Sequence, residues 1–333
     1  MNPTRNDAPL NRRYIVGLDV GTAKVAVVVG AVDAGGVLEV VASSTVPSKG
    51  LERGAVVNIE ATRACIAEAM NHAQQQLGLP IKSAHVGISG AHVRSLNSQG
   101  VHPLKTREVT KPDIQSVINA ACAVAIPADQ RILHVLPQEY AVDSQTGIVA
   151  PLGMAGVRLE VQAHIVTVAN AAAQNLEKCV ESCNLSVQKL VLQQMASAEA
   201  ILTPDEKELG VCVVDIGGGT ADIAIYRHGA IRYTAVVPVG GKLVSNDLAV
   251  FLRTPLADAE HLKISHGCAE PRMVQNNDTL DVPSMGDRPA RSLSRHALAQ
   301  VIWARYSEIF QFIFKELKKS GFDDMLPGGV VLT

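Results

Sequence analysis

The chain contains two stretches with the same order of apolar and polar positions. Residues 15–30 and 211–226 each run from an apolar segment through Asp-x-Gly and a Thr into a second apolar segment. This order predicts a β-hairpin in both places. In residues 15–30 apolar positions fall on both faces, as is typical of a sheet that is covered on both sides. Two copies of one such unit predict two related halves, each with its own sheet and its own Asp-Gly turn.

Strand and helix patterns alternate through most of the chain between the two hairpins. A strand pattern at 38–41 precedes a helix that Asn58 caps and that ends at Gly78. Further patterns follow in the order strand, helix, strand, helix, at residues 164–168, 171–183, 187–192 and 195–202. This alternation is typical of an α/β sheet with parallel segments, so we expect an α/β fold.

Residues 82–163 have a different pattern and predict an inserted subdomain. Strand patterns lie at 85–89, 131–142 and 157–163, and one helix begins at Thr110 with a sequence that resembles a capping box. Near the end of the chain, a helix pattern over 298–318 carries aromatic side chains that we expect to pack in the core: Trp303, Tyr306, Phe310, Phe312 and Phe314. Any part of that apolar area left uncovered is an aggregation hazard.

The composition describes a globular chain with an aliphatic core. The 333 residues are 47% hydrophobic but only 3% aromatic, so Val, Ile, Leu and Ala must build the core. The formal net charge of −2 at pH 7 excludes a polybasic nucleic-acid binder, and we expect no nucleic-acid partner. No stretch approaches the ~20 apolar residues of a membrane span, which predicts a cytoplasmic protein.

The two Asp-Gly turns have the chemistry of a phosphate site. Glycine-rich turns let backbone N–H groups approach an anion closely, and a run of such groups forms an anion nest. A carboxylate beside each nest would repel a phosphate unless a cation lies between them, so Asp19 and Asp215 predict a hydrated Mg²⁺ that bridges the phosphates. The pattern is not a P-loop, because it lacks Gly-Lys-Ser/Thr. It is not a dinucleotide-binding fingerprint either, because that motif leads into a helix and this one leads into a strand.

These motifs resemble the phosphate motifs of the superfamily that contains actin, sugar kinases and the ATPases of heat-shock chaperones. More closely, residues 16–25, 47–50, 135–140, 210–223 and 286–292 resemble the FtsA family of bacterial cell division proteins, over about residues 13–333. The resemblance implies an actin-like (ribonuclease H-like) duplicated fold with an inserted 1C subdomain of SHS2 type. The implied subdomains are 1A (1–82 and 164–200), 1C (83–163), 2A (201–240 and 301–333) and 2B (241–300).

The resemblance also implies roles for individual residues. It assigns ATP and Mg²⁺ as cofactors, with Asp19 and Asp215 near the metal and in contact with it through water. It places these residues at the nucleotide: Gly21, Thr22, Ala23 and Lys24 in the first phosphate loop; Gly217, Gly218, Gly219 and Thr220 in the second; and Gly240, Gly241 and Arg295 beside them. Gln194 falls where relatives carry the residue that orients the attacking water. A surface glutamine at a helix start is the alternative for that position.

Partners and location follow from the same resemblance. FtsA proteins form actin-like filaments, bind the C-terminal peptide of the tubulin-like protein FtsZ through 2B, and recruit later division proteins partly through 1C. Arg288 and Arg291 match a basic docking site for that peptide, with a solvated loop as the alternative. The family reaches the cytoplasmic face of the inner membrane at the septum through a C-terminal amphipathic helix. That helix and the family's third glycine motif do not occur in this sequence, so we expect impaired membrane attachment and nucleotide affinity if the chain is complete.

Two other classes of protein share these phosphate motifs. A sugar-kinase type of phosphotransferase needs a carboxylate base facing an acceptor hydroxyl, and the chain offers no clear candidate between the hairpins. A chaperone-type ATPase domain would lack the inserted subdomain. The sequence shows no separate catalytic base, so we expect at most a slow Mg²⁺-dependent ATPase.

Overall fold

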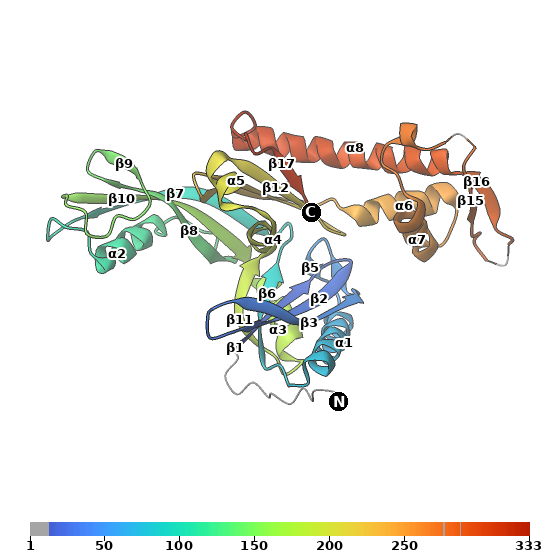
Figure 1. Ribbon diagram of the computed structural model, residues 1–333, viewed down its shortest axis with the longest axis horizontal. Helices are drawn as coiled ribbons and strands as arrows, with labels where there is room; N and C mark the ends of the chain where they lie inside the picture. The colour runs from blue at the N-terminus through green and yellow to red at the C-terminus, as the bar shows by residue number, and fades with distance from the viewer. Residues whose placement is uncertain (1–12, 276, 287) are drawn as a thin grey trace, which may run out of the picture. The chain divides into compact units, whose positions relative to one another are not determined.

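The structure is a computed structural model that describes residues 13–275, 277–286 and 288–333. It divides into two compact units (Figure 1). The first unit comprises residues up to Ile88 together with Ala171–Gln193, and the second comprises Ser89–Asn170 with Gln194–Thr333.

The first unit is built on a five-stranded sheet in the order β11-β6-β1-β2-β3. Its strands are β1 (Arg13–Val20), β2 (Lys24–Val32), β3 (Leu38–Pro47), β6 (Ser83–Ile88) and β11 (Ser186–Leu192). The first predicted hairpin is present, because β1 pairs antiparallel with β2. On its other side β1 pairs parallel with β6, as an α/β sheet requires.

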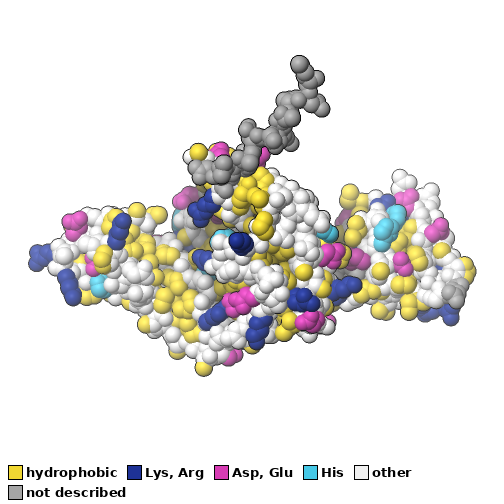
Figure 2. Space-filling view, turned by 90° about the horizontal axis from the view of Figure 1, so that it is seen from below, with side chains coloured by type: hydrophobic (Ala, Val, Ile, Leu, Met, Phe, Trp, Pro, Cys, Tyr) yellow, Lys and Arg dark blue, Asp and Glu magenta, His cyan; other side chains and the backbone are white. Residues whose placement is uncertain are grey.

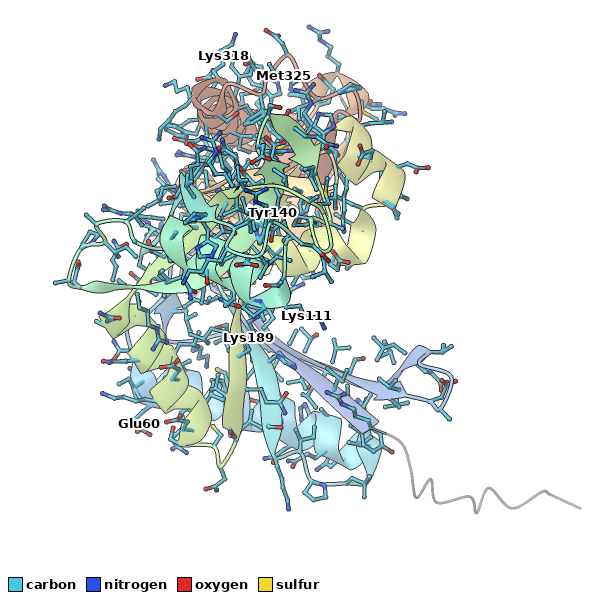
Figure 3. All side chains as sticks on the ribbon, turned by 90° about the vertical axis from the view of Figure 1, so that its left-hand side faces the viewer. Glu60, Lys111, Tyr140, Lys189, Lys318 and Met325 are labelled. Atoms are coloured by element: carbon cyan, nitrogen blue, oxygen red, sulfur yellow. The ribbon has the colours of Figure 1, made fainter. Side chains whose placement is uncertain are left out.

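Two helices pack on this sheet. Helix α1 (Ile59–Leu77) begins where predicted, since the Asn58 side chain accepts a hydrogen bond from the N–H of Ala61, and it ends at Gly78 in the left-handed conformation. Figure 3 labels Glu60 in its first turn. Helix α3 (Asn170–Glu181) lies beside α1, with the Cys179 thiol 3.8 Å from the Ile59 carbonyl oxygen.

The other face of the sheet differs from the prediction. Val16 and Val27 are buried, but Ile15 and Val28, which point the opposite way, are 36% and 44% exposed. Among the described residues, the coverage on both faces that the sequence predicted is therefore incomplete. The alternation of residues along the strands shows that both faces of the sheet are apolar. It does not show which elements cover each face.

The inserted part of the second unit is a four-stranded antiparallel sheet in the order β7-β10-β8-β9. Its elements are β7 (Val93–Pro103), β8 (Gln130–Val142), β9 (Gln145–Ile148), β10 (Arg158–Ala169) and helix α2 (Lys111–Ala121). As predicted, α2 begins with a capping box: the Asp113 carboxylate accepts from the N–H of Thr110 at 3.0 Å. Tyr140, labelled in Figure 3, belongs to the core between this helix and the sheet.

Two strand assignments made from the sequence are wrong. The strand expected inside the insertion at 85–89 is β6, which pairs with β1 and β11 of the first sheet. The strand expected at 164–168 in the main sheet is the second half of β10, which pairs with β7 and β8. Register shifts interrupt the β8–β10 ladder without ending it, so one long strand has the pattern of two.

The rest of the second unit carries the second predicted hairpin. The sheet has the order β14-β13-β12-β17, and β12 pairs antiparallel with β13. Its strands are β12 (Val211–Ile216), β13 (Ala221–Arg227), β14 (Ala230–Val237) and β17 (Val330–Leu332). Around it lie α4 (Gln193–Ile201), α5 (Pro204–Leu209), α6 (Gly241–Leu252), α7 (Leu256–His266), the short 3₁₀ helix η1 (Pro271–Met273), β15 (Thr279–Val282), β16 (Arg291–Ser294) and α8 (Arg295–Ser320).

Of the five aromatic side chains of α8 that were predicted to pack in the core, Tyr306 does so, and the other four are exposed at 36% or more. The helix buries its aliphatic stripe, Leu298, Ala299, Ile302, Ile309, Ile313 and Leu317. The aromatic residues lie beside that stripe, and Trp303 and Phe314 are 50% and 56% exposed. Phe310 and Phe314 line an apolar groove of about 360 Å³ with Val330 and Leu332 of β17.

The inserted sheet contacts the edge strand β14 through polar side chains. The buried imidazole of His164 bonds through Nδ1 to Asn97 Oδ1 at 2.6 Å and through Nε2 to Thr234 Oγ1 at 2.9 Å. The Gln138 amide donates to the carbonyl oxygen of Ile231 at 2.8 Å. These side chains satisfy backbone and hydroxyl groups that an edge strand would otherwise leave open.

The charge of the chain is dispersed. On the face drawn in Figure 2, Lys and Arg side chains are scattered among acidic and hydrophobic ones. No described helix combines the length and the apolar character needed to cross a bilayer.

Candidate functional site

The two hairpin turns have the same internal hydrogen bond. In the first, the N–H of Gly21 donates to the carbonyl oxygen of Lys24 at 3.0 Å. In the second, the N–H of Gly217 donates to the carbonyl oxygen of Thr220 at 2.9 Å. The glycine that follows Asp-x thus closes a four-residue turn in both places, so the repeat in sequence is also a repeat in backbone structure.

The loop that follows β3 holds the first turn in place. The N–H of Gly54 donates to Thr22 Oγ1 at 3.2 Å, and the N–H of Ser48 donates to the carbonyl oxygen of Ala23 at 3.0 Å. Ala23 and Lys24 are exposed at the tip of the turn. The predicted first phosphate loop is therefore a braced turn with an accessible tip.

Asp19 is held by a residue that the sequence analysis did not select. The amide nitrogen of Gln193 donates to Asp19 Oδ1 in a short hydrogen bond. Gly87 of β6 lies against this pair: a Cβ there would be 3.3 Å from Asp19 Oδ1 and 3.1 Å from Gln193 Cγ. Only a residue without a side chain leaves this pair undisturbed.

Asp215 and Asp222 lie directly opposite each other across the second hairpin. Carboxylates in this position repel each other, and each one has a hydroxyl donor. Ser197 Oγ donates to Asp215 Oδ2 at 2.6 Å, and Ser89 Oγ donates to the buried Asp222 at 2.5 Å. The Thr220 hydroxyl also donates to Asp222, at 3.3 Å. The sequence analysis missed Asp222, although a carboxylate within an apolar strand was a signal.

The second glycine turn packs against the start of α6. The N–H groups of Gly241 and Lys242 donate to the carbonyl oxygens of Gly217 and Gly218, both at 2.9 Å. A Cβ on Gly240 would lie 2.5 Å from the Gly217 carbonyl oxygen and 2.8 Å from the Gly218 carbonyl carbon. The structure thus brings the predicted residues Gly217, Gly218, Gly240 and Gly241 into one backbone cluster.

A polar network supports this cluster from α7. Lys263 Nζ donates to the Gly241 carbonyl oxygen at 3.1 Å, to Ser245 Oγ at 2.9 Å and to Glu260 Oε2 at 2.8 Å. Burial by itself raises the pKa of Glu260, but hydrogen bonds from Lys263 and Ser245 outweigh it and lower that pKa. The sequence analysis did not find this network, because only the packing of α6 on α7 brings these residues together.

Gln194 is fully buried on α4, which contradicts the alternative of a surface glutamine. Neither its amide nitrogen nor its amide oxygen has a hydrogen-bond partner among the described residues. An unpaired buried polar group costs about 1–3 kcal/mol, so such a residue in a folded protein calls for an explanation. Gln194 thus carries one donor and one acceptor group that the described residues do not use.

Two of the three predicted arginines, Arg291 and Arg295, have protein partners of their own. Arg295 Nε donates to the His266 carbonyl oxygen at 3.0 Å, and its guanidinium pairs with Asp278 at 3.4 Å. Arg291 donates to the Leu252 carbonyl oxygen at the end of α6, whereas Arg288 is exposed. Arg295 and Arg291 thus tie the smaller β15–β16 sheet to the helices, and their predicted ligand contacts stay predictions.

The donor set suits magnesium with phosphates better than a metal held by protein alone. No cluster of three or more His, Cys, Asp and Glu side chains able to hold a metal occurs in the described part of the chain. Mg²⁺ keeps several waters and typically binds one or two carboxylates plus substrate phosphates. Asp19 in the first unit and Asp215 in the second unit each stand at the start of a glycine turn, and each is a carboxylate of the kind that Mg²⁺ binds.

The fold and these turns define a class. The chain resembles solved actin-like proteins in overall structure. One is a PilM–PilN type IV pilus biogenesis complex, with a TM-score of 0.66 and 16% identity over 97% of this chain and 82% of that chain. Another is MreB5 of Spiroplasma citri bound to ADP, with a TM-score of 0.53 and 14% identity over 96% of this chain and 84% of that chain. Identities this low show the fold alone. The chain is therefore an actin-like α/β protein with an inserted subdomain.

Sequence comparison identifies the family within that class. The family model "SHS2 domain inserted in FTSA" matches residues 90–167, and "Cell division protein FtsA" matches residues 212–331. The chain is 55% identical to cell division protein FtsA of Pseudomonas aeruginosa, over 96% of this chain and 77% of that protein. It is 42% identical to FtsA of Escherichia coli, over 97% and 79%. The chain belongs to the FtsA family of cell division proteins.

The expected fold class is thereby confirmed: a duplicated actin-like fold with an SHS2-type insertion. The family model "Ethanolamine utilisation protein EutA" also matches, over residues 158–260, which include the second hairpin. The role in cell division that the resemblance implied is supported at the level of the family.

Proposed function

We propose that this protein binds ATP with Mg²⁺ and uses the bound nucleotide to control its assembly into actin-like filaments. The observation that carries the proposal is the pair of matched Asp-Gly turns, with Asp19 and Asp215 at equivalent positions and the same turn hydrogen bond in each. Two solved MreB5 neighbours bind ADP and AMPPNP, respectively. A shared fold with glycine turns in both halves supports the same ligand class here.

Within this proposal the residues of the chain have distinct tasks. Backbone N–H groups within the turns at Gly21–Lys24 and Gly217–Thr220, other than those of Gly21 and Gly217 that close the turns, bind phosphate oxygens. The buried amide of Gln194 donates to, and accepts from, the water that attacks the γ-phosphate. Mg²⁺, when bound, neutralises charge on the phosphates. Hydrolysis is slow, because the site offers an orienting amide rather than a strong base.

We further propose that the protein links FtsZ to the inner membrane at the septum. The C-terminal peptide of FtsZ docks near Arg288, whose exposed guanidinium suits carboxylates. The inserted sheet serves later division proteins. Membership of the FtsA family supports each of these assignments.

Two assays test the proposal against a phosphotransferase. Sedimentation of this protein with and without ATP measures its assembly, and pelleting that depends on ATP is expected. Sedimentation in the presence of FtsZ measures the linkage between the two proteins, and co-pelleting with FtsZ is expected. In parallel, ADP release is measured with ATP and glucose or glycerol. Release that depends on the acceptor, without ATP-dependent pelleting, would overturn the proposal in favour of a sugar-kinase type of enzyme.

A further inference from the structure

Helix α4 supplies one hydrogen-bond donor to each of the two motif aspartates. Its first residue, Gln193, donates to Asp19 within the first unit. One turn later, Ser197 Oγ donates to Asp215 Oδ2 at 2.6 Å within the second unit. Neither donor belongs to a phosphate motif. Each one donates to the aspartate that precedes the glycine turn of its own unit.

The Ser197 hydroxyl makes a bond that its place in a helix does not dictate. A helical serine usually faces solvent or donates to the carbonyl one turn earlier in its own helix. Ser197 is half-buried and instead donates out of α4 to the end of strand β12. A hydrogen bond to a charged acceptor is stronger than a neutral one, so this contact restricts the Asp215 side chain.

The position of Asp215 explains why its orientation needs such a donor. Asp222 stands directly opposite on β13, and two facing carboxylates favour rotating apart. Asp222 is fixed by Ser89 and Thr220. The hydrogen bond from Ser197 to Oδ2 holds the Asp215 carboxylate in one orientation and leaves Oδ1 outside that bond.

We propose that Ser197 is a positioning residue: it holds Asp215 so that Oδ1 can accept from the hydration shell of the Mg²⁺ that accompanies the nucleotide. The inference rests on the proposed nucleotide function and deepens it. Ser197 itself does not contact the ligand. Its loss leaves the carboxylate in place but free to rotate, so magnesium binding weakens while the contacts of the glycine turns with nucleotide persist.

The test is a titration of Mg²⁺ against a fixed concentration of fluorescent ATP analogue, with fluorescence as the measure of binding. For Ser197→Ala the Mg²⁺ concentration at half-maximal binding is expected to rise about threefold to tenfold, which is the size of effect that the net contribution of one typical hydrogen bond produces. Ser197→Thr, which keeps the hydroxyl, is expected to stay within about twofold of the parent protein. The double variant A196S/S197A keeps the composition of α4 but moves the hydroxyl, and should behave like Ser197→Ala.

Thermal unfolding of each variant separates positioning from folding. If Ser197→Ala unfolds, Ser197→Cys provides a near-isosteric weak donor and should shift the Mg²⁺ requirement in the same direction. An unchanged Mg²⁺ requirement in Ser197→Ala, or a loss of binding that does not depend on Mg²⁺, would overturn the inference. If the parent protein shows no Mg²⁺-dependent binding, the proposed function itself fails.

Discussion

The N–H of Gly241 donates to the carbonyl oxygen of Gly217 at 2.9 Å, which joins the first residue of α6 to the second glycine turn. The neighbouring Gly240 approaches the same turn so closely that a Cβ would lie 2.5 Å from the Gly217 carbonyl oxygen. The shape of the turn therefore depends on the absence of a side chain at position 240.

Gly240→Ala is expected to push α6 away from the turn and to weaken binding of a fluorescent ATP analogue by about tenfold or more, since displaced N–H donors cost heavily. Gly17→Ala is the matched control, because a Cβ at position 17 has no atom within 4 Å. Equal affinities for Gly240→Ala and Gly17→Ala would show that the packing of α6 on the turn does not shape the site.

Gly100→Ala is expected to destabilise the inserted sheet. A Cβ there would lie 2.1 Å from the Val117 carbonyl oxygen and 2.7 Å from the Ala121 nitrogen, so helix α2 must move off strand β7. Overpacking of this kind costs about 1–3 kcal/mol of unfolding free energy or more. Chemical denaturation measures the loss, and a variant as stable as the parent protein would contradict the close packing of α2 on β7.

The protein is expected to lose stability as the pH falls below neutrality, because of His164. Burial lowers the pKa of His164 from 6.5 to about 4. Between these two pH values the imidazole is therefore protonated in the unfolded chain and neutral in the folded chain, which favours unfolding. The contribution of the neutral imidazole is complete above pH 6.5 and is lost progressively as the pH falls toward 4. The loss amounts to about 3 kcal/mol at its fullest.

Unfolding free energies measured by denaturant between these two pH values check this expectation. His164→Gln should flatten the pH dependence. Burial also lowers the pKa of His92, so part of the slope should remain in His164→Gln. An equally steep slope in His164→Gln and the parent protein would remove His164 as the cause.

Charge reversal in the β15–β16 region should weaken binding of an FtsZ C-terminal peptide. Arg288→Glu is the sharper variant, with an expected loss of about threefold to tenfold from an exposed charge. Arg291→Glu should weaken binding too but also lower stability, because Arg291 donates to the Leu252 carbonyl oxygen. Arg272→Glu, with its side chain 94% exposed, is the control. Fluorescence anisotropy of a labelled peptide measures all three; unchanged affinity in both Arg288→Glu and Arg291→Glu would contradict the docking site.

Features encoded within a few residues were predictable from the sequence. The cap at Asn58, the capping box at Thr110 and the two hairpins all depend on neighbours in the chain, and each is present. The aspartate positions in the hairpins followed from the repeat alone. These features required no knowledge of which surfaces pack together.

Features decided by tertiary packing were not predictable. The pattern at 164–168 fits a strand of either sheet, and only pairing with β7 and β8 assigns it. Four aromatic residues of α8 lie one position away from a residue of the buried aliphatic stripe, so a pattern that counts them as core places them wrongly: Trp303, Phe310, Phe312 and Phe314. Gln193 and Ser197 reach their aspartates only because α4 packs as it does, so nothing in the local sequence marks them as donors.

We propose that the twin Asp-Gly turns bind a magnesium nucleotide. Equilibrium binding of a fluorescent ATP analogue, with Mg²⁺ and with excess EDTA, tests it most directly in the parent protein and in D19N and D215N. Binding that is strengthened by Mg²⁺, and that loses this dependence in both variants, is the predicted result. Binding with no response to Mg²⁺, or the same response in all three proteins, would contradict the account.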